Sequence, residues 1–235
     1  MRNLLLGPVA LLFAAGCYPT LPPHIAEGTE VLKPGGVSLT VAGGGAGFDA
    51  NVSPSAGTQS SAVGAGGLEA RVRVGVGAKQ EVGVSAFLGV GSPSGGSDPP
   101  FAAGGKLSYK VAPVPWLAFV ADVGAFDHAA ASIGVVGGDL AAIFAPYTAE
   151  NGSQLYFAAK GGFAVPFLTG ARDMNESFEI PIGFAFHTSE RVRFFVEGGP
   201  VLGFAQLVTD AAPDTSQNAT SFGAYGIVAF AFVLR

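Results

Sequence analysis

The chain has 235 residues, of which 49% are hydrophobic and only 12% are charged, and its mean hydropathy is +0.45. Soluble domains usually carry about 25% charged residues, so this composition is unusual for a protein dispersed in water. The formal net charge is −5 and no basic cluster is present, which argues against nucleic-acid binding. Beyond the N-terminal segment, no stretch approaches the roughly 18 uninterrupted apolar residues of a membrane-spanning helix.

Residues 1–16 have the features of a secretion signal. A positive charge at Arg2 precedes an apolar stretch over residues 4–15, which is too short to span a bilayer as a helix. Small residues then lead directly to Cys17, the only cysteine of the chain, which therefore cannot form an intramolecular disulfide. The alternative is an ordinary secretory signal with a cysteine that lies nearby by chance.

The segment 12–17, Leu-Phe-Ala-Ala-Gly-Cys, resembles the lipobox of bacterial lipoproteins. The resemblance implies that Cys17 is acylated and becomes the mature N-terminus. In that family an aspartate after the cysteine marks retention in the inner membrane, so Tyr18 implies export to the outer membrane. Residues 17–35 contain four prolines and predict a lipidated, extended tether in which His24 is solvated.

Apolar residues occupy every second position through most of residues 36–235, which predicts β-strands. In residues 68–76, for example, Leu, Ala and Val alternate with Glu, Arg and Gly. Residues 131–144 are Gly-rich with a less regular pattern, and we expect a bulge at Gly137-Gly138. The expected strands cover residues 37–42, 68–77, 81–90, 106–111, 116–123, 131–144, 154–163, 178–187, 191–197 and 222–234.

The connections between these strands alternate in length. Short or medium turns are expected near residues 79–80, 113–115, 146–153 and 189–190. Longer loops are expected at 49–64, 93–100 and 208–218, and loops of moderate length at 126–130 and 168–177. Short periplasmic turns and longer extracellular loops are typical of outer-membrane barrels, and an even strand number places both ends of the barrel on the periplasmic side.

Residues 36–235 are similar in pattern to small bacterial outer-membrane β-barrel proteins. The resemblance implies an all-β fold, namely a single antiparallel transmembrane β-barrel of about ten strands (roughly 8–12) in an up-and-down meander. Barrels of that family often end in an aromatic residue, whereas this chain ends in Arg235. Trp116, Tyr109 and Tyr147 lie beside expected turns and are candidates for an interfacial aromatic girdle.

In such a barrel the apolar face of each strand points to lipid and the charged face points into the lumen. Two hypotheses follow: the charges form ion pairs that fill the lumen, or they line a narrow water-filled pore whose slight positive excess favours anions. The residues expected to line the lumen, five acidic and seven basic, are Glu69, Arg71, Arg73, Glu81, Lys106, Lys110, Asp122, Lys160, Glu179, Arg191, Arg193 and Glu197.

No motif points to an enzyme, a cofactor or a metal ion. Adjacent residues of an extended segment point in opposite directions, so Asp127-His128 is a poor catalytic dyad, and His187 is expected to make a structural hydrogen bond. Histidine and cysteine at metal-ligand spacing are lacking in the sequence.

The expected function is therefore that of an outer-membrane β-barrel lipoprotein of a Gram-negative bacterium, with its N-terminus on the periplasmic side. Its role would be structural or interactive at the cell surface, or passive passage of small solutes. Membrane lipids are the expected partner, nucleic acid is not, and no motif points to a protein partner. The alternative is a lipid-tethered, soluble periplasmic β-barrel that binds an apolar ligand in its interior.

Overall fold

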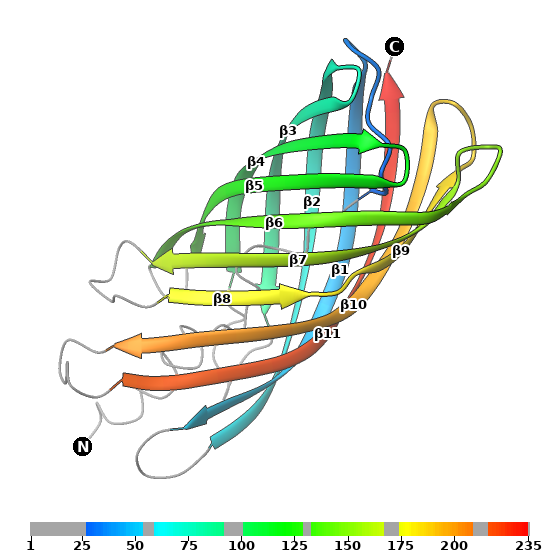
Figure 1. The fold of residues 1–235 in the computed structure, drawn as a ribbon. Helices are drawn as coiled ribbons and strands as arrows, with labels where there is room; N and C mark the ends of the chain where they lie inside the picture. Colours follow the sequence, from blue (N-terminus) through cyan, green and yellow to red (C-terminus); the bar gives the residue numbers. More distant parts are fainter. Residues whose placement is uncertain are drawn as a thin grey trace, which may run out of the picture.

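The computed structural model describes residues 27–53, 59–91, 101–128, 133–166, 174–208 and 216–234 as one antiparallel sheet of eleven strand segments (Figure 1). None of these residues belongs to a helix long and apolar enough to cross a bilayer. The segments are β1 (Val37–Ser53), β2 (Gln59–Gly77), β3 (Gln80–Gly91), β4 (Phe101–Val114), β5 (Leu117–His128), β6 (Ile133–Thr148), β7 (Gln154–Pro166), β8 (Met174–Glu179), β9 (Ile182–His187), β10 (Val192–Val208) and β11 (Ser216–Leu234).

The sheet closes on itself as a barrel of ten wall strands. Segments that follow one another in the sequence pair, except β8 with β9, and β1 pairs with β11, so that Val37 lies opposite Leu234. Segments β8 and β9 both lie between β7 and β10 and form one wall strand, interrupted at Ile180-Pro181. Proline has no N–H to donate to the ladder, which explains the interruption. The predicted up-and-down barrel of about ten strands is confirmed.

The two ends of the barrel differ in their connections. The connections β2–β3, β4–β5, β6–β7 and β9–β10 lie at the same end as Val37 and Leu234, which we call the short-turn end. The opposite end, the loop end, carries connections that fall outside the described residues. The expected loop at 49–64 was too long, because β1 continues to Ser53 and β2 starts at Gln59.

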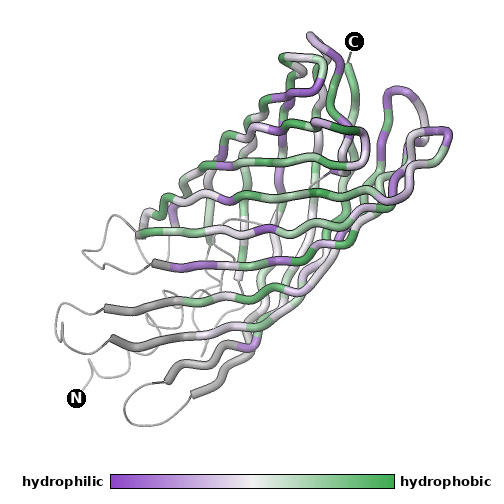
Figure 2. The backbone as a smooth tube through the Cα atoms, viewed as in Figure 1, coloured by the Kyte–Doolittle hydropathy of each residue, from purple (hydrophilic) through white to green (hydrophobic). Residues whose placement is uncertain are grey.

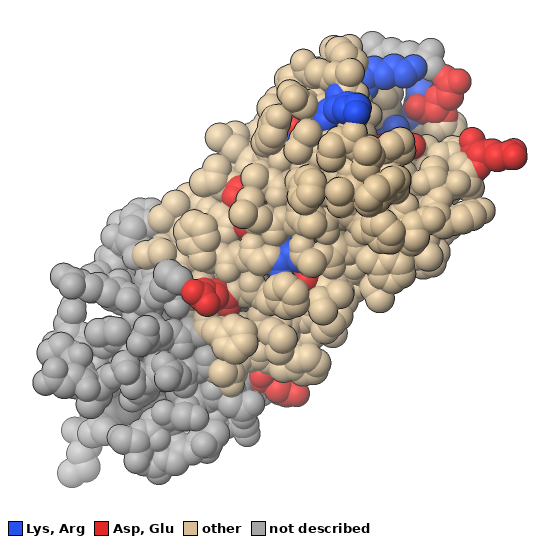
Figure 3. Space-filling view, in the orientation of Figure 1, with Lys and Arg blue, Asp and Glu red and all other residues tan. Residues whose placement is uncertain are grey.

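The outer face of the barrel wall is apolar. Val72, Phe184 and Phe230 are 40%, 46% and 49% exposed, whereas the charged residues on the opposite face of the strands are buried. Hydropathy alternates along the wall strands (Figure 2), and most of the visible outer face is uncharged, with charged groups near the short-turn end and acidic ones toward the loop end (Figure 3). The alternative of a soluble barrel with an apolar interior was therefore wrong, because soluble proteins rarely expose an apolar surface this large to water.

Aromatic side chains gather on the outside of the short-turn end. Trp116, Tyr109 and Tyr147 are all exposed, and the ring of Trp116 packs edge-on against Phe144 with centroids 5.6 Å apart. This position suits amphipathic rings at a membrane–water interface.

The expected bulge at Gly137-Gly138 was wrong, because both residues pair regularly with β5 and β7. The register of β6 shifts instead between Phe144 and Tyr147, near the short-turn end.

Candidate functional site in the barrel lumen

The lumen contains most of the charged residues that the sequence assigned to it. Arg193 is partly buried, with 16% of its side chain exposed. The remaining residues of the predicted set, apart from Arg191, are buried: Glu69, Arg71, Arg73, Glu81, Lys106, Lys110, Asp122, Lys160, Glu179 and Glu197.

Arg191 does not line the lumen. It lies in the turn that precedes β10 and its side chain is exposed, so its assignment was wrong. Alternation alone extended the strand one residue too far, and the side chain of Arg191 in the turn is exposed to solvent.

Three acidic residues of the lumen were missed. Asp139 is buried on β6, and Glu27 and Glu30 belong to the segment that precedes the barrel. With them the described lumen holds more acidic than basic side chains, so the expected positive excess was wrong. The acidic residues are Glu27, Glu30, Glu69, Glu81, Asp122, Asp139, Glu179 and Glu197, and the basic ones are Arg71, Arg73, Lys106, Lys110, Lys160 and Arg193.

Ion pairs join neighbouring strands across the inner face of β2, β3 and β4. Arg71 contacts Glu69 on the same strand at 2.8 Å, and Lys106 of β4 lies 3.7 Å from the same carboxylate. Arg73 pairs with Glu81 of β3, which also lies 3.8 Å from the Lys110 ammonium. Charges removed from water need such partners, and the alternating signs on adjacent strands supply them.

A second ionic group lies on the opposite wall. The Lys160 ammonium on β7 lies 3.7 Å from Asp139 of β6 and 3.3 Å from Glu179 of β8. One cation thus contacts two carboxylates and links three consecutive strands.

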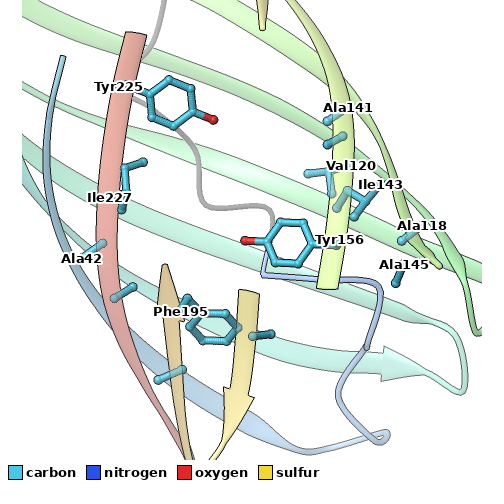
Figure 4. Packing of buried hydrophobic residues seen from close by; sticks show 14 of the residues in the cluster. Ala42, Ala118, Val120, Ala141, Ile143, Ala145, Tyr156, Phe195, Tyr225 and Ile227 are labelled. Carbon is cyan, nitrogen blue, oxygen red and sulfur yellow. The ribbon is translucent and has the colours of Figure 1, made fainter. Parts of the chain in front are cut away.

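Two tyrosines share a single carboxylate in the barrel interior. The hydroxyls of Tyr156 on β7 and Tyr225 on β11 donate hydrogen bonds to Glu197 of β10, at 2.8 and 2.9 Å. Figure 4 shows both rings projecting into the barrel from their strands. The Tyr156 ring lies over Gly183, where an added Cβ would come within 2.7 Å of the ring carbon Cε2, so this position requires glycine.

Residues 27–36, which we call the lumen segment, fold into the barrel at its short-turn end. Glu27 is 3% exposed and pairs with both Arg71, at 3.6 Å, and Arg73. Glu30 lies 3.2 Å from both His187 and Arg193. These partners belong to β2, β9 and β10, so the segment reaches different sides of the wall.

Further hydrogen bonds hold the same segment in place. Thr29 donates its backbone N–H to Gln154 Oε1 at 2.9 Å and its hydroxyl to the Pro115 carbonyl at 2.6 Å. The Leu32 N–H donates to Glu81 at 2.9 Å, and Lys110 donates to the carbonyl of Glu30 at 2.7 Å. The described part of the expected tether therefore crosses the lumen rather than hanging free of it.

The segment runs along β2 at a position that only glycine permits. Gly35 donates its N–H to the Gly75 carbonyl at 2.8 Å, and the Gly75 N–H donates to Gly36 at 2.9 Å. A Cβ on Gly75 would lie 2.7 Å from the Leu32 carbonyl oxygen, closer than real Cβ atoms approach.

Beyond the charged layer, toward the loop end, small residues form much of the inner face. On β1 and β2 these are Ala42, Gly44, Ala65 and Gly67. Ala102 continues the series on β4 and is buried. Larger side chains such as Phe87 and Ile227 share this inner face, and a cavity of about 70 Å³ remains between them and the small residues.

The other residues that the sequence analysis considered for catalysis, metal binding or acylation are not part of the ionic network described in the lumen, with the exception of His187. Asp127 is exposed at the loop end of β5, while the side chains of His128, His24 and Cys17 lie outside the described residues. His187 accepts a hydrogen bond at its carbonyl from Asn151 and donates its N–H to Ser153 Oγ at 3.0 Å. Within the described ranges, no group of three or more His, Cys, Asp or Glu side chains could hold a metal ion.

No protein-family model matches this chain, and no curated protein matches it either. Solved structures with a similar fold include the COG4313 outer membrane channel of Pseudomonas putida F1, at 11% identity and a TM-score of 0.48, covering 90% of this chain and 100% of that one. The outer membrane protease OmpT of Escherichia coli is 10% identical with a TM-score of 0.47, covering 88% and 100%. OprG of Pseudomonas aeruginosa is 12% identical with a TM-score of 0.39, covering 89% and 99%. These likenesses concern the fold alone.

Proposed function

We propose that this protein is a narrow outer-membrane channel for the passive passage of small solutes. The observation that supports this proposal is the inner face beyond the charged layer, where residues such as Gly44, Gly67 and Ala102 have small side chains or none. A barrel with a purely structural role gains stability when large side chains fill its interior at native packing density. Here glycine and alanine leave space behind a charged, hydrophilic layer.

The lumen segment forms the narrow part of this path. Its polar contacts with the wall, such as Glu27–Arg73 and Thr29–Gln154, can be exchanged for water, while Val31 packs against the buried apolar cluster. A solute passes beside the segment or after the segment moves aside.

A structural or surface-interaction role is the second candidate. The observation that favours it is the pairing of lumen charges, as at Lys160 and Glu179, which is also how a sealed barrel neutralises its interior. Catalysis forms no part of either proposal.

The exposed apolar wall supports insertion in a bacterial outer membrane, with membrane lipids as the surrounding partner. Short turns are typical of the periplasmic side, which would place Val37 and the preceding residues there. Acylation of Cys17 would then add an anchor of about 0.8 kcal/mol per buried CH2. Labelling with radioactive palmitate tests this anchor: wild type should be labelled and Cys17→Ser should not, whereas an unlabelled wild type refutes the anchor.

Flux through the barrel tests the proposed passage. Proteoliposomes that contain the wild-type chain should swell in an isosmotic pentose solution faster than empty liposomes, and more slowly in a trisaccharide solution. Ala158→Phe adds a ring to the buried inner face of β7 and should slow the pentose, while Ala159→Phe, on the exposed face of the same strand, should not. Heat-modifiable migration on a gel shows that each barrel is folded. Wild-type swelling equal to that of empty liposomes would favour the structural role.

A further inference from the structure

A cavity of about 70 Å³ lies inside the barrel against β1, β2 and β3, toward the loop end. This volume is several times the roughly 10–15 Å³ that one water molecule requires. Its lining includes Ala42, Ala46 and Ala65 on β1 and β2, together with Phe87, Ala102, Phe126 and Ile227. Ala42, Phe87, Ala102 and Ile227 are buried.

The lining is almost entirely apolar. Phe87 and Phe126 meet edge-on with ring centroids 6.1 Å apart, and Ile227 closes the β11 side. Apolar cavities of this kind hold water poorly and bind uncharged apolar molecules instead.

Glu69 is the only charged residue among the described residues of the lining. Its carboxylate is already paired with Arg71 at 2.8 Å and lies 3.7 Å from Lys106. A charged ligand would have to compete with these partners, whereas a neutral one would leave them undisturbed.

We propose that this cavity is a binding site for one small, uncharged apolar molecule, with Phe87 and Phe126 as its aromatic wall. The site sits directly beyond the charged layer of the lumen, so its occupant contacts hydrocarbon on the cavity side and leaves the ion pairs intact. The proposal goes beyond solute passage, because binding at this site requires no flux through the barrel.

Xenon, observed by ¹²⁹Xe NMR with the full chain in phosphatidylcholine nanodiscs, is a direct probe, because it is an apolar guest smaller than benzene and the cavity holds about 70 Å³. Empty nanodiscs give the non-saturable partition into lipid, and the wild-type chain should add a saturable component of one site per barrel. Ala46→Phe fills the cavity from the inner face of β1 and should weaken this component at least tenfold, a change of about 1.4 kcal/mol. Val84→Phe, which adds the same ring on the lipid-facing side of β3, should bind as wild type does.

Phe87→Ala provides a second test that does not depend on filling the cavity. The enlarged space should accept fluorobenzene, observed by ¹⁹F NMR, in a saturable manner, with weaker binding of fluorobenzene to wild type. Non-saturable uptake of xenon by folded wild-type barrels, or equal xenon binding by folded Ala46→Phe barrels, overturns the proposal. Since neither measurement involves transport, absence of flux with retained binding would overturn only the proposed passage.

Discussion

The carboxylate of Glu27 pairs with the Arg73 guanidinium across the boundary between the lumen segment and the barrel wall. Both side chains are buried, and Arg73 also pairs with Glu81 of the neighbouring strand. The pairing ties a segment without regular structure to the most charged part of the lumen.

Glu27→Gln should loosen this segment. Arg73 would keep Glu81 but lose its second carboxylate, so the free energy of unfolding should fall by about 1–3 kcal/mol. Lys33 is exposed within the segment and should be cleaved faster by trypsin. Urea unfolding in lipid vesicles and a trypsin time course measure both effects.

The matched control is Glu30→Gln. The Glu30 side chain is 30% exposed, so the loss of its pairs with His187 and Arg193 should cost less than about 1 kcal/mol. If Glu30→Gln lowered the free energy of unfolding as much as Glu27→Gln or more, the buried Glu27–Arg73 pair would not be the stronger attachment of the segment.

Gly183→Ala should disturb the shared carboxylate in the interior. The new Cβ would overlap the Tyr156 ring and displace its hydroxyl from Glu197, at a cost of about 1–3 kcal/mol. Gly161→Ala is the control, because the nearest atom to a Cβ there lies 4.0 Å away. The temperature at which the folded gel band disappears should fall for Gly183→Ala alone; equal shifts would refute the packing argument.

Depth in the membrane should govern the cost of a charge on the outer face. Val228 and Leu234 lie on the same exposed face of β11, the first well inside the strand and the second at its short-turn end. Val228→Arg should destabilise the barrel in lipid by about 2–4 kcal/mol and Leu234→Arg by about 0–1 kcal/mol. Equal costs in urea titrations would mean that this face does not cross a hydrocarbon layer.

The excess of acidic side chains in the described lumen predicts that the channel conducts cations slightly better than anions. Under a KCl gradient the reversal potential should shift toward the potassium equilibrium potential, and Arg193→Gln should strengthen that shift. Arg191→Gln, two residues earlier but exposed in the turn, should leave it unchanged. A preference for chloride would restore the expectation drawn from the sequence.

The alternation of apolar and polar residues predicted which face of the wall each residue lies on. Successive side chains of a strand point to opposite faces, so a strand with one face in lipid has an apolar residue at every second position. In residues 68–76 the alternation placed Glu69, Arg71 and Arg73 correctly on the inner face. The same signal failed at Asp139, since its neighbours Gly137 and Gly138 have no side chains to mark a face.

The lumen segment could not be predicted for a different reason. Glu27 and Thr29 find their partners on β2 and β7, far along the chain, and the segment itself has no periodicity. Only the closed barrel brings these groups together. Likewise the cavity beside Phe87 depends on the six strands that line it.

The most direct test of the account is single-channel conductance in planar bilayers, with Gly75→Ala as the decisive variant. A Cβ at position 75 pushes against the Leu32 carbonyl and should displace the lumen segment, whereas at Gly77 the nearest atom to a Cβ lies 3.5 Å away. The account predicts small currents for wild type and Gly77→Ala and clearly larger ones for Gly75→Ala. Silence of all three folded, inserted barrels at every voltage would contradict it.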